Sequence, residues 1–153
     1  MKSFTPIILI ALFAAVMFLP GLRRGGITHD GLNAALARAD TEDKHVFLAF
    51  IGSDWCDWCI KFEREIYRSP VFQGYASSNL VTVMVDFPRG DRGAKTADQR
   101  KQDSRLADQF RVRGFPTFFL ISAEGETLAK TGYHCGGPEA YIAHIDQLIT
   151  GAK

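Results

Sequence analysis

The sequence predicts an α/β domain built on a mixed central sheet with helices on both faces. Short apolar segments of the kind found in strands alternate along most of the chain with segments whose apolar residues recur at helical spacing. Near the C-terminus, two strand-like segments follow each other across a short polar turn, which indicates an antiparallel hairpin. Strands that alternate with helices pair in parallel, so the hairpin makes the sheet mixed.

Composition places the chain among globular proteins. Its 153 residues suit one domain plus a short extra segment, and 46% of them are hydrophobic and 23% charged. The formal net charge of +1 gives no electrostatic footprint for nucleic acid. Of the three cysteines, two lie close together and one lies far off, which is not the pattern of a small disulfide-stapled domain.

Residues 1–26 form a segment of their own, which we expect to be a signal peptide or a membrane anchor. Lys2 precedes an uncharged apolar run over residues 7–19, which is shorter than the roughly 20 residues of a membrane span. A cleaved signal therefore fits better than an uncleaved anchor, although Arg23-Arg24 lies where signal peptidase prefers small residues. A buried helix of the domain is a third interpretation, but the run has no amphipathic stripe. Export implies a periplasmic or other extracytoplasmic location, which is oxidising.

The first elements of the domain each have a local signal. Asp30 can cap a helix whose apolar residues recur at helical spacing, and the polar residues 40–44 end it. The continuous apolar run Val46–Ile51 predicts a strand buried on both faces. The chain then turns at residues 52–55, and a helix begins at about Cys56.

The later elements continue the alternation. Ser69-Pro70 opens a second helix, with Ser as the N-cap and Pro at the first helical position. The inner face of the preceding helix carries Cys59, Phe62 and Ile66. The remaining expected elements are a strand at Leu80–Val85, a charged surface loop at 86–101 running into a helix marked by Leu106, Ala107 and Phe110, hairpin strands at Thr117–Ile121 and Thr127–Thr131, and a closing helix from Ala140 to Ile149.

Two cysteines carry the predicted chemistry. Cys56 and Cys59 lie three residues apart at the start of a helix that directly follows a buried strand, so both sulfurs lie on one side. The first helical turn has free N–H groups and a partial positive charge, which lower the pKa of a thiol. We therefore expect Cys56 to attack as a thiolate and Cys59, one turn deeper, to resolve the mixed disulfide. An inert disulfide or half of a zinc site is the alternative.

A proline motif agrees with this interpretation. Gly114-Phe115-Pro116-Thr117 opens the strand that runs to Ile121. Proline has no N–H donor and is tolerated at the start of a strand. A cis bond before Pro116 would bend the chain sharply and leave the backbone of Phe115 unpaired and accessible, although most such bonds are trans.

Three segments carry the most specific pattern in the sequence. They are Phe50-Ile51-Gly52-Ser53-Asp54-Trp55-Cys56-Asp57-Trp58-Cys59, Val85-Asp86-Phe87-Pro88 and Gly114-Phe115-Pro116-Thr117. Together they resemble the thioredoxin family over about residues 30–150, and the chain is most similar to bacterial exported thioredoxin-like proteins with a Gly-Ser-Asp-Trp-Cys-x-x-Cys motif. The resemblance implies a thioredoxin-like domain at residues 27–153, a cis-Pro116 facing the cysteines, a substrate groove along the Phe115 backbone, and Trp55 beside the site.

Two departures from the family bear on the chemistry. Thioredoxin itself has a buried acidic residue six positions before the first cysteine, where this chain has Phe50. The proton of the resolving cysteine must then pass to water or to another group. Asp57 should raise the pKa of Cys56 and make the couple more reducing, unless it points to solvent and merely caps the helix start. We expect the neighbouring Trp58 to contribute to a binding surface.

The third cysteine and the histidines lie outside these motifs. The histidines are His29, His45, His134 and His144. We expect each to be solvated or satisfied locally. His134-Cys135 could join the cysteine pair in a four-ligand zinc site, but thioredoxin-like pairs are usually metal-free, so we expect no metal. Cys135 is either a free, partly buried thiol that packs like a small apolar residue or a third thiol that forms a mixed disulfide with Cys56 or a second chain.

The sequence and the resemblance together predict a thiol–disulfide oxidoreductase. Its Cys56/Cys59 dithiol would reduce or isomerise disulfides in exported proteins, with no bound cofactor. Its expected partners are protein thiol or disulfide substrates and an upstream redox partner, and membrane attachment would use residues 7–19. A dithiol oxidase differs in direction only. A non-catalytic thioredoxin-like binding module or metal carrier that uses the same cysteines is the alternative from another class.

Overall fold

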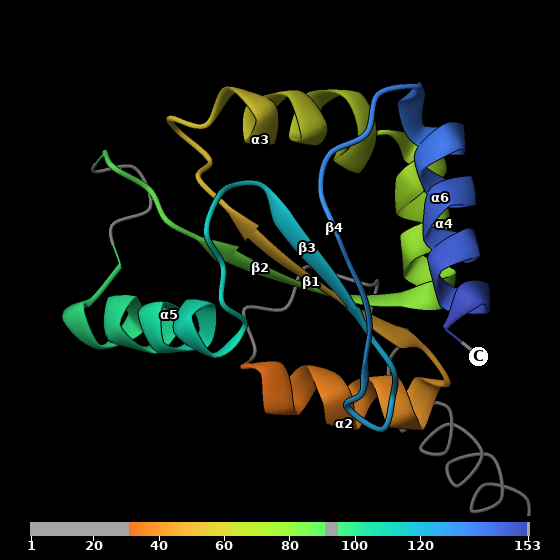
Figure 1. Ribbon diagram of the computed structural model, residues 1–153, viewed down its shortest axis with the longest axis horizontal. Helices are drawn as coiled ribbons and strands as arrows, with labels where there is room; N and C mark the ends of the chain where they lie inside the picture. Colours follow the sequence, from red (N-terminus) through yellow and green to blue (C-terminus); the bar gives the residue numbers. More distant parts are fainter. Residues whose placement is uncertain (1–30, 91–94, 153) are drawn as a thin grey trace, which may run out of the picture.

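The computed structural model describes residues 31–90 and 95–152. In chain order, the elements are α2 (Leu32–Glu42), β1 (His45–Ile51), α3 (Asp57–Phe62), η1 (Glu63–Tyr67), α4 (Pro70–Asn79), β2 (Leu80–Asp86), α5 (Ala97–Gln109), β3 (Thr117–Ile121), β4 (Thr127–Thr131) and α6 (Gly137–Gly151). Four strands form one mixed sheet in the order β2-β1-β3-β4, and helices cover both of its faces (Figure 1). The structure therefore confirms the predicted architecture.

The expectations for the N-terminal segment lie outside the described residues. These are the signal peptide or anchor over residues 1–26 and the capping role of Asp30. Among the helices that the structure describes, none has the length and apolar character needed to cross a bilayer.

The register of the sheet brings three connecting segments to one end of it. β1 and β2 run parallel with Ile51 opposite Asp86, so the chain leaves both strands at the same end. β3 runs antiparallel to β1 with Thr117 opposite Phe50, so the chain enters β3 at that end as well. The turn that contains the cysteines, the loop after β2 and the proline motif are therefore neighbours.

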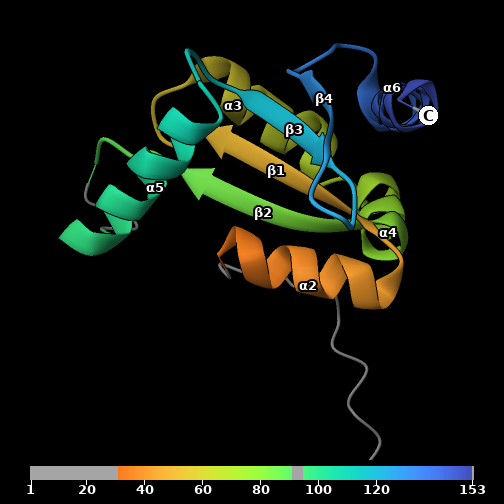
Figure 2. The ribbon, with the colours of Figure 1, turned by 60° about the horizontal axis from the view of Figure 1, so that its bottom comes forward.

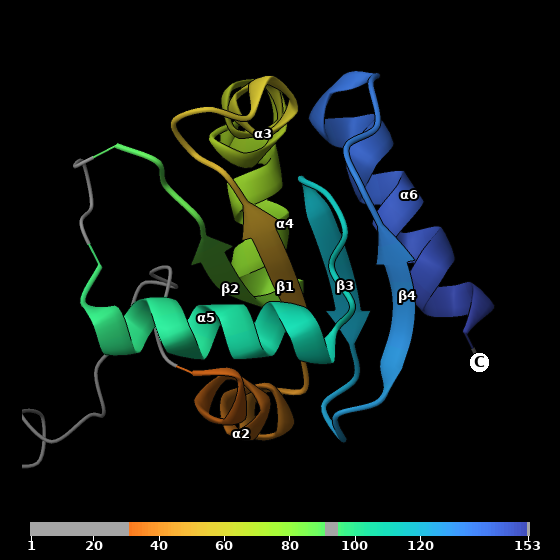
Figure 3. The ribbon, with the colours of Figure 1, turned by 60° about the vertical axis from the view of Figure 1, so that its left-hand side comes forward.

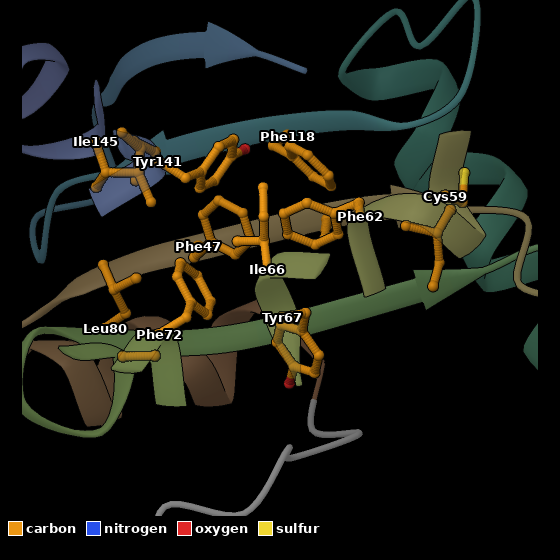
Figure 4. Close-up of a cluster of buried hydrophobic side chains, with 14 of the residues drawn as sticks. Phe47, Cys59, Phe62, Ile66, Tyr67, Phe72, Leu80, Phe118, Tyr141 and Ile145 are labelled. Carbon is orange, nitrogen blue, oxygen red and sulfur yellow. The ribbon is translucent and has the colours of Figure 1, made fainter. Parts of the chain in front are cut away.

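Two hydrophobic cores hold the helices to the sheet, one on each face. α3, η1, α4 and α6 lie on one face, and α2 and α5 lie on the other (Figures 2 and 3). The first core is largely aromatic, and the rings of Phe62 and Phe118 lie 4.5 Å apart at its centre (Figure 4). In the second core, Phe50 packs against Phe110 and Phe119 with ring centroids 5.9 Å apart in each case. Every residue of β1 from Val46 onward is buried, as predicted.

The first helix runs further than its apolar pattern indicates. The polar residues expected to end it at 40–44 instead continue α2 as far as Glu42. The Arg38 guanidinium and the Glu42 carboxylate pair at 2.6 Å along one face of this turn, and the Thr41 hydroxyl donates to the Ala37 carbonyl at 2.9 Å. These exposed local contacts extend the helix while Ala39 keeps its place in the core.

A change of helix type follows the cysteines. α3 continues as the π-helix η1, where the apolar spacing alone predicted a uniform helix. The wider turn still buries Ile66, as expected, and also buries Tyr67, which packs against Phe62 at 6.2 Å. The second helix begins as predicted, because the Ser69 hydroxyl accepts the Phe72 N–H at 3.0 Å and Pro70 opens α4.

We expect Phe72→Ala to lower the free energy of unfolding by about 3–5 kcal/mol, because its fully buried ring contacts several aromatic neighbours. The adjacent Val71 is the matched control, since it lies on the same helix and is 47% exposed. Val71→Ala should change stability by no more than about 0.5 kcal/mol. Urea denaturation measures both variants, and equal losses would contradict the placement of α4 against this core.

Candidate active site

The cysteine pair lies at the N-terminus of α3. Cys56 is the N-cap residue in an extended conformation, and it forms a disulfide with Cys59 across a Cα–Cα distance of 5.2 Å. The Cys59 N–H points at the Cys56 sulfur at 3.3 Å. On reduction, this N–H and the partial positive charge of the helix end favour a thiolate at Cys56. The helix thus begins one residue later than expected, because Cys56 itself supplies the cap.

The two sulfurs differ in their surroundings. Cys56 is 7% exposed and Cys59 is 2% exposed. The Cys59 sulfur accepts the Gly52 N–H at 3.4 Å. Both cysteines belong to the aromatic core below α3, and Cys59 lies at one end of the labelled cluster (Figure 4). Phe50, which stands where thioredoxin has an acid, is fully buried in the opposite core.

The two residues between the cysteines both face solvent. Asp57 is the first residue of α3 and is exposed, as the alternative expected, but the helix cap is Cys56 and not Asp57. Trp58 is 58% exposed, and its ring lies 5.8 Å from that of Tyr133. The ammonium of Lys61 lies 5.4 Å from the centre of the Trp58 ring. The Trp58 ring is therefore a solvent-exposed aromatic surface beside the disulfide.

The indole of Trp55 occupies a closely defined place before the pair. Its ring N–H donates to the Phe87 carbonyl at 2.7 Å. A Cβ atom on Gly52 would lie 2.5 Å from the indole, so only glycine leaves room for the ring there. The ring also packs edge-to-face against Phe115 at 5.6 Å. Trp55 and Phe115 therefore form one continuous aromatic surface beside Cys56.

The loop after β2 is tied to the turn that precedes Cys56. The Asp86 carboxylate accepts the Ser53 N–H at 2.9 Å and the Ser53 hydroxyl at 2.6 Å. The Asp54 carboxylate accepts the backbone N–H groups of Arg89 at 3.0 Å and Gly90 at 2.6 Å. These hydrogen bonds from the Arg89 and Gly90 amides lower the pKa of Asp54 below its usual value, so Asp54 is ionised at neutral pH.

Arg89 is a site residue that the sequence did not reveal. Its guanidinium carbon lies 3.8 Å from the centre of the Trp55 ring. The motif Val85-Asp86-Phe87-Pro88 stops one residue before it, and nothing in a single sequence indicates that the next side chain turns back onto a tryptophan. The one available signal is that β1 and β2 are consecutive parallel strands, so the turn after β1 and the loop after β2 lie at the same edge of the sheet.

The proline motif lies beside the same aromatic surface. The Phe115–Pro116 peptide bond is cis, and both residues are half-buried. Phe115 packs against Phe87 at 5.3 Å as well as against Trp55. The Thr117 hydroxyl donates to the Gly114 carbonyl at 2.8 Å and closes the turn.

Cys135 lies in the loop after β4 and is not part of the disulfide. Its thiol is free and exposed, so the partly buried packing expected as one alternative is wrong. In the same loop, the Tyr133 hydroxyl donates to the Glu65 carboxylate at 2.7 Å. Within residues 31–90 and 95–152, no three His, Cys, Asp or Glu side chains come together as metal ligands, so His134 and Cys135 do not complete a four-ligand site.

The chain is similar to thioredoxin-like proteins. The chain matches the family model described as a thioredoxin-like domain over residues 32–149. It is 39% identical over 115 residues to the disulfide bond reductase DsbH of Chlamydia pneumoniae, which covers 75% of this chain and 68% of that protein. The thioredoxin-related protein DsbJ of the same organism is 24% identical over 133 residues, covering 82% of this chain and 38% of DsbJ.

Solved structures agree on the fold. A structure described as DsbH oxidoreductase superposes with a TM-score of 0.72 at 35% identity and covers 82% of this chain and 85% of its own. The C-terminal domain of Neisseria meningitidis DsbD in the reduced form has a TM-score of 0.53 at 22% identity, over 76% of this chain and 92% of that domain, which supports the fold alone. With its cysteine pair at the start of α3, this chain belongs to the thioredoxin-like family and is a thiol–disulfide oxidoreductase.

Proposed function

We propose that this protein reduces or isomerises disulfides in exported proteins through Cys56 and Cys59. The observation that carries the proposal is the position of Cys56 as the N-cap of α3, with its sulfur facing the Cys59 N–H. A reducing direction is also supported by the similarity to a protein named as a disulfide bond reductase. A dithiol oxidase would use the same residues, so the reduction potential of the pair decides between the two directions.

The exchange proceeds in two balanced steps. The Cys56 thiolate attacks one sulfur of a substrate disulfide, forms a mixed disulfide and releases the other substrate sulfur as a thiolate. Cys59 loses its proton and attacks the Cys56 sulfur, which releases the second substrate thiol. The substrate has gained two electrons, and the protein is left with the Cys56–Cys59 disulfide. An upstream redox partner, a dithiol protein, then reduces this disulfide in the same way.

The surrounding residues are assigned to substrate binding. Trp55 and Phe115 form the wall along which a substrate segment lies, and Pro116 shapes the turn beside it. Trp58 offers an exposed ring to the same segment. Asp57, which lies next to Cys56, opposes the thiolate charge and favours a more reducing couple. The exchange itself needs only sulfur atoms and protons, so no bound cofactor takes part.

Two cysteine substitutions separate the roles of the pair. Cys56→Ser should abolish reduction of insulin disulfides, because the attacking sulfur is lost. Cys59→Ser should trap mixed disulfides with substrates, because nothing resolves them. Non-reducing electrophoresis and mass spectrometry detect the trapped species.

Cys135→Ser is the matched control, since its exposed thiol lies outside the disulfide. We propose that Cys135 is a third thiol, which forms a mixed disulfide with Cys56 or with a second chain under oxidising conditions. The reduction of insulin does not require this thiol. This variant should retain the wild-type rate. Trapping by Cys56→Ser in place of Cys59→Ser would reverse the assignment of attacking and resolving cysteines.

We propose that residues 1–26 export the domain at 27–153 as a cleaved signal peptide, with an uncleaved anchor through residues 7–19 as the alternative. Lys2 followed by the apolar run supports the proposal. The protein would then work in the periplasm or an equivalent oxidising space, where its substrates acquire disulfides.

Cell fractionation tests export. A cleaved signal should give a shortened soluble protein outside the cytoplasm, and an anchor should give a full-length protein in the membrane fraction. A variant that lacks residues 1–26 is the control and should remain in the cytoplasm. Full-length soluble protein found in the cytoplasm would contradict both versions.

A further inference from the structure

The turn before Cys56 is joined to the loop after β2 by side chains from both segments. The contacts involve Asp54 and Trp55 on the turn and Phe87, Arg89 and Gly90 on the loop. Each of these residues contributes a contact: the Asp54 carboxylate binds two backbone amides, and Trp55 binds a carbonyl and lies against a guanidinium. Such a dense set of contacts at the entrance to a catalytic pair indicates a role in positioning.

We propose that Asp54 and Arg89 are positioning residues that hold the Trp55 indole beside Cys56 and thereby set how tightly the site binds an extended substrate segment. The inference rests on the proposed disulfide reduction. It concerns two residues that make no sulfur contact in the exchange, and it assigns their effect to the shape of the substrate wall.

The Trp55 ring is held by three separate constraints. The Gly52 backbone leaves no room for any atom beyond Cα, so the ring lies close against the chain. The hydrogen bond to the Phe87 carbonyl fixes the indole N–H at 2.7 Å. The Arg89 guanidinium, 3.8 Å from the ring centre, stacks on the aromatic system. Losing Arg89 removes the one constraint that comes from an exposed side chain.

Asp54 acts on the ring through Arg89. Its carboxylate accepts the amides of Arg89 and Gly90, so it fixes the backbone from which the guanidinium extends. Hydrogen bonds to an ionised acceptor are stronger than those between neutral groups. Replacing Asp54 with Asn removes the charge while keeping the size of the side chain, and this should loosen the loop and the stacked guanidinium together.

The position of the Trp55 ring affects substrate binding because the ring lies beside both Cys56 and the proline motif. Trp55 precedes Cys56 in the chain and packs edge-to-face on Phe115, the residue before Pro116. A substrate segment that presents its disulfide to Cys56 must therefore lie along this surface. If the ring moves, the wall loses its shape while the two sulfurs keep their places on α3, so binding should suffer more than the chemical step.

The test uses Arg89→Met and Asp54→Asn, with Arg89→Lys as the conservative replacement. Arg68→Met is the matched control, because Arg68 is an exposed arginine at the C-terminal end of η1 that pairs with Glu63. For reduction of a peptide with one internal disulfide, KM should rise about tenfold in the first two variants and less in Arg89→Lys, with kcat nearly unchanged. The melting temperature shows that each variant is folded.

Trp55 fluorescence gives a second readout that is independent of turnover. The chain has two tryptophans, so Trp58→Phe leaves Trp55 as the sole tryptophan, which can be excited selectively over the tyrosines. In that background, Arg89→Met and Asp54→Asn should make Trp55 more accessible to acrylamide and lower its anisotropy, whereas Arg68→Met should not. Wild-type KM and wild-type quenching in both variants would overturn the inference. A raised KM without a fluorescence change would also overturn it, because Arg89 would then bind substrate directly.

The two proposals fail in different ways. If the wild-type protein did not reduce disulfides, the proposed function would be wrong, while the fluorescence of the variants would still decide whether Asp54 and Arg89 hold the ring. If the wild-type protein reduces the peptide and the variants match it in both readouts, only the positioning role is wrong.

Discussion

The reactivity of this protein depends on the point where a buried strand gives way to a helix. β1 is buried along almost its whole length, so its direction is fixed by the two cores, and α3 starts six residues after it ends. That short connection leaves Cys56 at the helix cap, where its sulfur lies 3.3 Å from the Cys59 N–H, which also contacts the Cys56 carbonyl at 2.9 Å. The position of Cys56 at a helix N-terminus is therefore a consequence of the fold, and a helix N-terminus is a position that stabilises a thiolate once the disulfide is reduced.

The rest of the site depends on the same sheet edge. Because β1 and β2 are parallel and β3 is antiparallel to β1, three segments distant in sequence converge where Cys56 lies. The mutual contacts among these segments are aromatic and polar, and they involve Trp55, Phe115 and Arg89. Both cysteines also border the aromatic core under α3, and the Cys59 sulfur accepts the Gly52 N–H from the turn that precedes the pair.

Much of this could be predicted from the sequence, and the failures have two different causes. The hairpin strands have the predicted bounds, because short strand-like segments on either side of a polar turn are local signals. The cysteine pair was identifiable because its chemistry depends on a helix start. The extension of α2 to Glu42 was missed, since ion pairs on an exposed face leave no apolar period. The π-turn η1 and the Arg89–Trp55 contact were missed because they depend on packing between distant segments.

The reduction potential of the Cys56–Cys59 couple tests the central claim most directly. Equilibration of the full domain in thiol–disulfide buffers, followed by alkylation of free thiols and mass spectrometry, gives the oxidised fraction at each poise. A reductase should have a potential at or below about −230 mV, in the range of thioredoxin at about −270 mV. A value near that of the strong oxidant DsbA, about −120 mV, would show that the helix N-terminus stabilises the thiolate enough to make the protein an oxidase, and it would contradict the reducing function.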